Sequence, residues 1–200
     1  MPSWLKRTLA RGDRDPGAAR WVVIEVETSG LDPLTDCLIS IGGVAMHATG
    51  HVLPGDSLEV TYLQPKASSR DNILVHGIGV AAQLEGRNPG QATRAFLDLA
   101  GSGPILAFHA AFDRGFLARA VKVFVNEPFH NPWLDLAALA PALDDWLVRY
   151  GIPVSARHSA AGDAFATALL AARLLHEARR QGANDFAAMQ RLARAARWVQ

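Results

Sequence analysis

The stretch WVVIEVETSG, residues 21–30, sets two carboxylates into an otherwise apolar run. Its β-branched and aromatic residues favour a buried strand. Alternate residues of a strand project from the same face, so Glu25 and Glu27 point the same way. A buried carboxylate is costly unless it is paired, protonated or bound to a metal, and two neighbouring anions repel unless a cation lies between them. The stretch therefore predicts a core strand that carries a metal site.

Composition narrows the classes of protein that this chain can belong to. The 200 residues, half of them apolar and a fifth charged, suit one substantial globular domain. The net charge of +1 gives no overall basic field for a polyanion. Cys37 is the sole cysteine, which excludes an intramolecular disulfide and a cysteine zinc site. No apolar run reaches the ~18 residues of a membrane span, and no signal peptide is evident, so we expect a cytoplasmic protein without membrane contact.

Basic residues gather near both ends of the chain. A solvated face explains such clusters at least as well as phosphate contact does. The clusters comprise Lys6, Arg7, Arg11, Arg14 and Arg20 at the start, and Arg179, Arg180, Arg191, Arg194 and Arg197 near the end.

Hydrophobic periodicity predicts a three-stranded meander followed by helices alternating with strands. This order favours a mixed sheet flanked by helices. The expected strands are 21–27, 37–46, 58–63 and 104–108, with a turn at 28–36 and a hairpin-like return at 50–55. The expected helices are 3–10, 91–99, 112–123, 134–143 and 159–180, and a last one that begins after a cap at Asn184. We divide the chain into an N-terminal helix and linker (1–19), a main domain (20–180) and a C-terminal helix packed on that domain (181–200).

Three further polar residues stand beside apolar segments. Asp113 lies where a strand passes into a helix, and capping would explain it equally well. Asp163 lies on an alanine- and leucine-rich helix, where it is either part of a solvent stripe or functional. His158 precedes that helix; a surface position or a cap is the ordinary explanation, although a histidine kept neutral there would accept a proton from water.

The order Glu-x-Glu, Asp, His-x4-Asp resembles that of a known family. From residue 20 to 177 the chain resembles, in register and in order, the motifs of DEDDh-type 3′→5′ exonucleases, the DnaQ-like superfamily that includes polymerase proofreading epsilon subunits and ribonuclease T. The segments that carry the resemblance are 25–33 (EVETSGLDP), 36–44 (DCLISIGGV), 75–78 (VHGI), 108–117 (FHAAFDRGFL) and 157–164 (RHSAAGDA).

The resemblance implies a ribonuclease H-like fold, in which a five-stranded mixed sheet, antiparallel meander first and parallel strands after, is flanked by helices. It implies two divalent cations, Mg²⁺ or Mn²⁺, about 4 Å apart. Their ligands would be Glu25, Glu27, Asp113 and Asp163, of which the last three also count as catalytic. His158 would be the general base. The implied reaction releases nucleoside 5′-monophosphates from the 3′ ends of single-stranded nucleic acid, with DNA favoured over RNA.

The resemblance also implies where a nucleotide binds. Thr28, Gly30 and Leu31 would hold the terminal nucleotide, and His76 and Ile78 would line its pocket. An apolar contact with a base face tolerates any sequence, as an exonuclease requires. For Leu31 and Ile78, a place in the hydrophobic core is the alternative.

Two departures from the family pattern lie at the motifs of the expected site, and the first of them bears on activity. Glu25 stands where the family has aspartate, and a displacement of about 1 Å can cost ~100-fold in rate. The alternative function is therefore a catalytically weakened nucleic-acid-binding or polymerase-accessory subunit with the same fold. Phe108 and His109 replace His-Asn, which we expect to alter the support around Asp113. A structural protein with a buried salt-bridge network is a third interpretation, but these motifs lack cationic partners.

The sequence leaves the partners open. A DNA polymerase subunit and a second copy of the chain are both candidates, because the last helix could support a homodimer as well as pack on its own domain.

Overall fold

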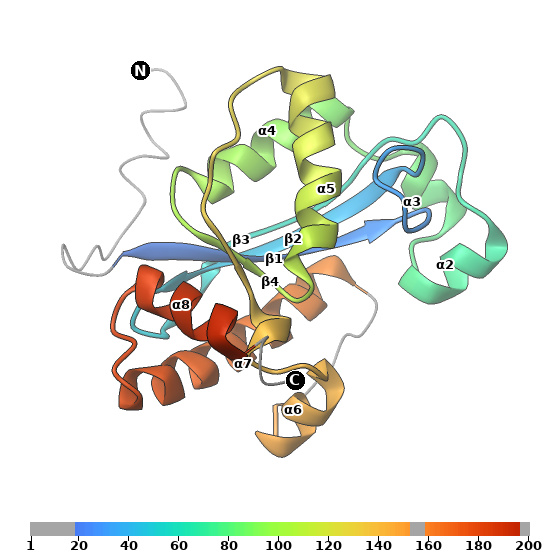
Figure 1. The fold of residues 1–200 in the computed structure, drawn as a ribbon. Helices are drawn as coiled ribbons and strands as arrows, with labels where there is room; N and C mark the ends of the chain where they lie inside the picture. Colours follow the sequence, from blue (N-terminus) through green and yellow to red (C-terminus); the bar gives the residue numbers. More distant parts are fainter. Residues whose placement is uncertain (1–18, 153–158, 197–200) are drawn as a thin grey trace.

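The computed structural model describes residues 19–152 and 159–196, which form a five-stranded mixed sheet with helices on both faces (Figure 1). The expected helix at 3–10, most of the linker, and His158 lie outside the described residues. The strand order is β3-β2-β1-β4-β5, with the first three strands antiparallel and β4 and β5 parallel to β1. The predicted fold class is thereby confirmed. The strands are β1 (Arg20–Thr28), β2 (Leu38–His47), β3 (Val52–Thr61), β4 (Ile105–Ala107) and β5 (Trp133–Asp135).

Different helices cover the two faces of the sheet. α4 and α5 pack on one face, while α7 lies across the other with α6 and α8 beside it (Figure 1). No helix in the described part of the chain has the length and apolar character to cross a membrane. The α-helices are α2 (Arg70–His76), α3 (Val80–Leu84), α4 (Pro89–Ala100), α5 (Ala110–Ala120), α6 (Leu143–Arg149), α7 (Ala160–Arg180) and α8 (Phe186–Ala196), with a π-helical turn η1 (Val121–Val125) and a 3₁₀ turn η2 (Leu136–Ala138).

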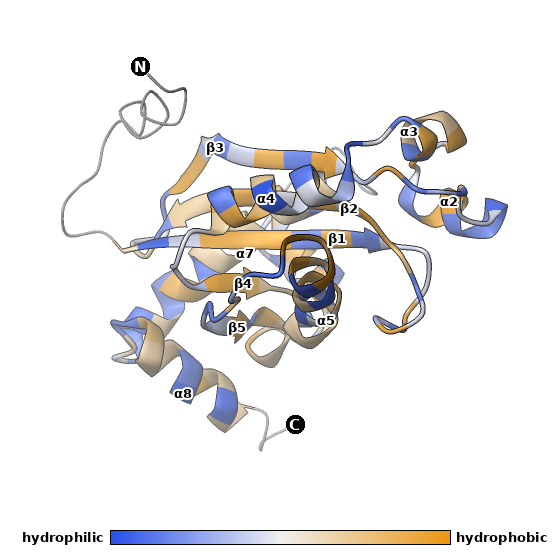
Figure 2. Ribbon diagram, turned by 90° about the horizontal axis from the view of Figure 1, so that it is seen from above, coloured by the Kyte–Doolittle hydropathy of each residue, from blue (hydrophilic) through white to orange (hydrophobic). Residues whose placement is uncertain are grey.

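The central strand β1 divides its side chains between two hydrophobic cores. Val22 and Ile24 belong to the core beneath α4 and α5, whereas Trp21 and Val23 belong to the core beneath α7. Because side chains alternate, the positions after Val23 on the α7 face are those of the two glutamates. Figure 2 shows the resulting change along β1, hydrophobic for most of its length and hydrophilic at its carboxyl end.

Two features of the fold bring other segments of the chain close to the carboxyl end of β1. The parallel strands β1, β4 and β5 all finish at the same edge of the sheet, so the residues that follow them converge there. Gly42 of β2 pairs with Glu25. A side chain at Gly42 would collide with the backbone of Ala160 and Ala161, so the missing side chain lets the start of α7 rest directly on the sheet.

The expected helix at 134–143 is wrong. Its first residues form β5, whose pairing with β4 outweighs the local helical pattern, and α6 begins only at Leu143, after Pro141. The third strand begins at Val52, earlier than expected, and α2 and α3 had no counterpart in the sequence analysis. Asp185, not Asn184, caps α8, since its Oδ1 accepts a hydrogen bond from the backbone N–H of Ala188 at 2.6 Å.

Candidate active site

Carboxylates from three segments meet at the carboxyl end of β1. Glu25 and Glu27 come from β1, Asp113 from the first turn of α5 and Asp163 from the first turn of α7. Each of the other three repels the charged form of Glu25, so all of them lie within its electrostatic reach. The structure thus gathers at one place the four side chains that the sequence singled out.

Burial and repulsion by neighbouring carboxylates raise the pKa values of Glu25, Glu27 and Asp113. Burial, and then the three neighbouring carboxylates, raise the pKa of Glu25 well above its usual value. Burial, and then Asp163, raise the pKa of Glu27 to about 7. Burial raises the pKa of Asp113 to about 8, although the backbone N–H groups of Asp113 and Val26 favour its charged form. Without a cation, the site therefore favours protonated carboxyl groups near neutral pH.

The donor set suits a hard divalent cation. Oε2 of Glu25 and Oδ1 of Asp113 are buried, and neither has a hydrogen-bond partner within residues 19–152 and 159–196. Carboxylate oxygens are the ligands that Mg²⁺ prefers. In the described part of the chain, no three acidic, histidine or cysteine side chains are already arranged to hold an ion. The cluster thus supplies suitable oxygens at one place, and the cation would have to draw them together against their repulsion.

The ordinary explanations for the two aspartates do not hold. Asp113 is 1% exposed and its carboxylate faces the backbone of β1, so it does not cap α5. Asp163 is half-buried at the sheet side of α7, within reach of Glu27, and so it does not belong to a solvent stripe. The cap of α7 is Ser159, whose Oγ accepts from the N–H of Gly162 at 3.0 Å.

The turn that follows β1 is held from two sides. Thr28 Oγ1 donates to the carbonyl of Gly30 at 2.7 Å, and the Thr28 carbonyl accepts from Asn72 of α2 at 2.9 Å. On the other side, Arg119 of α5 donates to the carbonyl of Pro33 at 2.9 Å. Leu31, at the tip, is 83% exposed, which rules out the alternative that it belongs to the core.

A hydrogen-bonded chain orders the neighbouring helix. The ring of His76 is buried, its Nδ1 accepts from the N–H of Ile78 at 2.9 Å, and its Nε2 donates to Oδ1 of Asn72 at 2.9 Å. Burial lowers the pKa of His76, which keeps this neutral form. Both ring nitrogens are engaged inside the protein. His76 therefore supports the corner where α2 and Ile78 meet the turn that follows β1, which we call the corner formed by α2. Ile78 is partly exposed and so is not a core residue either.

His109 takes a role that its sequence context did not indicate. We expected the replacement by Phe108 and His109 to alter the support around Asp113; the side chain of His109 is exposed and lines a cavity of about 420 Å³ together with Glu25, Leu143 and Asp144. Its backbone has φ 58° and ψ 47°, a left-handed conformation that is unfavourable for a side chain with a Cβ. Such strain persists only where the surroundings enforce it, and it is concentrated at functional sites.

Sequence reasoning missed Asp135, at the end of β5. Its charge adds to the rise in the pKa of Asp113. Its Oδ1 accepts from the N–H groups of Ala110 at 3.3 Å and Ala137 at 3.1 Å, so it fixes the start of α5, which carries Asp113. The expected helix at 134–143 concealed this residue; an aspartate directly after a short apolar strand is the signal that would have found it.

Known proteins match this architecture and its motifs. A family model described as an exonuclease (RNase_T) matches residues 22–171. The chain belongs to the DnaQ-like exonuclease family. This family membership confirms the resemblance drawn from the motifs, and it makes the carboxylate cluster part of an exonuclease domain.

Two relatives illustrate the similarity. A DNA polymerase III subunit epsilon-like protein of Rhodobacter capsulatus is 30% identical over 181 residues, which cover 84% of this chain and 25% of that protein. A DNA polymerase III PolC-type of Thermotoga maritima is 27% identical over 184 residues, which cover 88% of this chain and 13% of the relative. The chain therefore spans a quarter or less of the length of these relatives.

Solved structures agree on the fold. E. coli exonuclease I in complex with a dT13 oligonucleotide superposes with a TM-score of 0.71 over 82% of this chain and 42% of that one, at 17% identity. The form of exonuclease I described as apo gives a TM-score of 0.63 at 16% identity. The exonuclease domain thus keeps the fold of this enzyme although few residues are shared.

Proposed function

We propose that this exonuclease domain is a metal-dependent 3′→5′ exonuclease that releases nucleoside 5′-monophosphates from single-stranded DNA. The observation that carries the proposal is the convergence of four carboxylates from β1, α5 and α7, whose charged forms disfavour one another. The choice of DNA over RNA is supported by relatives that are named for DNA polymerase III and by a structural neighbour bound to a DNA oligonucleotide.

We assign the metal ligands to the carboxylate cluster. Two Mg²⁺ or Mn²⁺ ions held by it would, when bound, supply an activated water and stabilise the charge on the leaving 3′ oxygen. The chain itself orients the ligands, since the backbone N–H groups of Val26 and Asp113 face the Asp113 carboxylate and Gly42 admits the helix that carries Asp163. The ligands are Glu25, Glu27, Asp113 and Asp163.

We assign the general base to His158 on the strength of the family motif. It directly precedes Ser159, the cap of α7. The positive end of a helix disfavours a protonated ring, so a histidine at such a place keeps a nitrogen free to take a proton from water.

We place the terminal nucleotide against the turn that follows β1. The clamped backbone of Thr28 and Gly30 would position the 3′ end, and the exposed side chain of Leu31 would contact the last base. Ile78 would form the opposite wall, with His76 holding its backbone in place. Apolar contacts of this kind do not select a base, which suits removal of any nucleotide.

The alternative, a weakened accessory subunit, rests on Glu25 alone. The gathering of all four carboxylates favours the enzyme, because a protein that only bound nucleic acid would gain nothing from repelling its anionic ligand with buried carboxylates.

The proposal is tested by incubating the protein with a 5′-labelled single-stranded DNA and Mg²⁺ or Mn²⁺. We expect stepwise shortening from the 3′ end with release of mononucleotides, and no shortening with Asp163→Ala. Asp98→Ala is the matched control, because Asp98 is exposed on α4, which packs on the opposite face of the sheet. Absence of products with either metal, in a wild-type protein with a cooperative melting transition, would refute the proposal.

A further inference from the structure

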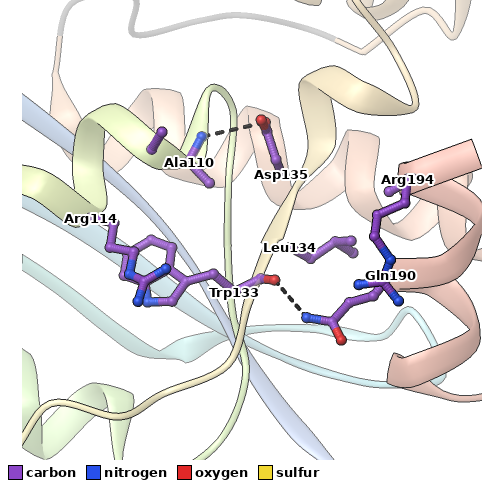
Figure 3. Close-up of a pocket in the computed structure, with 9 residues that line it drawn as sticks. Ala110, Arg114, Trp133, Leu134, Asp135, Gln190 and Arg194 are labelled. Atoms are coloured by element: carbon purple, nitrogen blue, oxygen red, sulfur yellow. Dashed lines mark hydrogen bonds between the residues drawn. The ribbon is translucent and has the colours of Figure 1, made fainter. Parts of the chain in front are cut away.

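A second cavity lies beside the carboxylate cluster, between α5, β5 and α8. It has a volume of about 220 Å³. Figure 3 shows Arg114 entering from α5 on one side, and Gln190 and Arg194 from α8 on the other, with Trp133 and Asp135 of β5 completing the walls.

The walls of this cavity are well anchored. Met189 and Ala193 are buried and fix α8 against the core. Gln190 Nε2 donates to the carbonyl of Trp133 at 3.0 Å, which joins α8 to β5 (Figure 3). Residues four apart share a helix face, so Arg194 projects beside Gln190. The two guanidinium groups are therefore presented from elements whose relative position is set by packing.

The cavity lies next to the active-site end of the sheet, since Asp135 in its wall is close enough to affect the pKa of Asp113. His109 lines the cavity that contains Glu25, and the next residue, Ala110, lines this one. Asp135 lines it as well and fixes the N–H of Ala110, while Arg114 follows Asp113 in the chain. A strand that passes from the carboxylate cluster over His109 would reach this cavity next.

The size and charge of the cavity select its ligand. Sites for whole drug-sized molecules occupy about 300–1,000 Å³, so this cavity suits a smaller group. Each guanidinium group carries a planar fork of donors that matches phosphate oxygens, and the cavity has one such group on each side. Asp135 is the one carboxylate among the described residues of its wall, and its Oδ1 already accepts from the N–H groups of Ala110 and Ala137.

We propose that the cavity formed by Arg114, Trp133, Gln190 and Arg194 binds a backbone phosphate of the nucleic-acid strand, upstream of the bond that is cut. This inference rests on the proposed function and extends it: the strand is gripped by α5 and α8 as well as by the turn that holds its 3′ end. One consequence is that α8 belongs to the substrate-binding surface of the domain.

The test measures binding of 5′-fluorescein-labelled thymidine octanucleotide by anisotropy, in EDTA, across a series of salt concentrations. Each phosphate contact to single-stranded DNA contributes about 0.7 to the slope of log affinity against log salt. We expect Arg114→Ala/Arg194→Ala to lower the slope by about 0.7 and the affinity by roughly tenfold. Arg191→Ala is the matched control, on the same helix and exposed but outside the cavity, and should leave the slope unchanged.

A second measurement separates this inference from the proposed function. With metal, the double variant should lose more of its kcat/KM on the octanucleotide than on a dinucleotide, which has no upstream phosphate. Binding in EDTA requires no turnover, so a protein without nuclease activity can still show the change in slope. Unchanged slope and affinity in the double variant, or an equal change in Arg191→Ala, would overturn the inference.

Discussion

The carboxylate cluster and the corner formed by α2 lie next to each other but treat their buried polar groups in opposite ways. In the cluster, one oxygen each of Glu25 and Asp113 is buried without a hydrogen-bond partner among the described residues. In the corner, the ring of His76 has both nitrogens engaged, by Asn72 and by the N–H of Ile78. The polar groups of the corner are paired without a ligand, whereas the cluster leaves buried oxygens that we propose are satisfied by a cation.

This contrast indicates different roles for the two regions. Fully paired polar groups hold a surface in one arrangement, which suits the nucleotide binding that we propose for this corner. Unpaired, repelling carboxylates raise the free energy of the metal-free site, and this cost is relieved when a cation binds. The two regions meet at Thr28, which ends the strand of the glutamates and accepts from Asn72.

The largest effect is expected from Asp113→Asn in the carboxylate cluster. It removes a charge from the cluster while keeping the shape of the side chain, so we expect exonuclease activity to fall by more than the ~100-fold that a 1 Å misplacement costs. Because the substituted group cannot ionise, the melting temperature of metal-free protein at alkaline pH should not fall. Activity assays and thermal melts in EDTA check both parts. Activity within about tenfold of wild type would show that Asp113 is not a metal ligand.

Glu25→Asp sharpens the contrast within the cluster. Glu25 lies opposite Gly42 and lines the cavity beside His109, so its length carries the carboxylate outward from the sheet. Shortening it withdraws the carboxylate, and we expect kcat to fall by about 10- to 100-fold. Single-turnover rates with Mg²⁺ and Mn²⁺ measure the change. A large gain instead would identify Glu25 as the cause of a weakened site and favour the accessory-subunit alternative.

Much of the fold could be predicted because local pattern and tertiary burial agree. β1 and α7 carry strong apolar patterns, and both were expected within a few residues of where they lie. β5 was missed because its three residues have no pattern of their own; they become a strand only by pairing with β4. α2 was missed for a related reason, since Leu74 and Val75 are exposed and the helix lacks an apolar stripe.

The residues of the candidate site also fall into those that the sequence could predict and those that it could not. The cluster was predictable because carboxylates inside apolar segments are conspicuous in a sequence. Nothing local distinguishes Asn72 from a surface residue, because its importance comes from contacts 44 residues away, at Thr28. The place of His109 at the cavity was not foreseen for a comparable reason: neither its left-handed backbone nor its position beside Glu25 leaves a mark in the sequence.

The raised pKa values of the carboxylate cluster should also make the stability of the metal-free protein depend on pH. Glu27 and Asp113 have folded pKa values of about 7 and about 8, above their unfolded values, so the folded state holds more protons between pH 4.5 and 8. The stability that this contributes is present at low pH and is lost as pH rises. We expect metal-free protein to melt at a lower temperature at about pH 9 than at about pH 6, with the difference reduced by saturating Mg²⁺. Glu25→Gln should flatten the profile, and a melting temperature that rises over this range in EDTA would contradict the prediction.

The smallest effect is expected in the corner, from Asn72→Ala. The substitution leaves the Thr28 carbonyl and His76 Nε2 without the partner that joins them, which costs about 1–3 kcal/mol and lowers the melting temperature by a few degrees. Asn72 holds the corner formed by α2, where we propose that the nucleotide binds, and it does not touch the carboxylates. KM should therefore rise while kcat changes little. Gln91→Ala, which removes an exposed amide from α4, is the control for loss of an amide side chain. A fall in kcat with KM unchanged would mean that the corner acts on the metal site itself, and that the two regions are not separate in function.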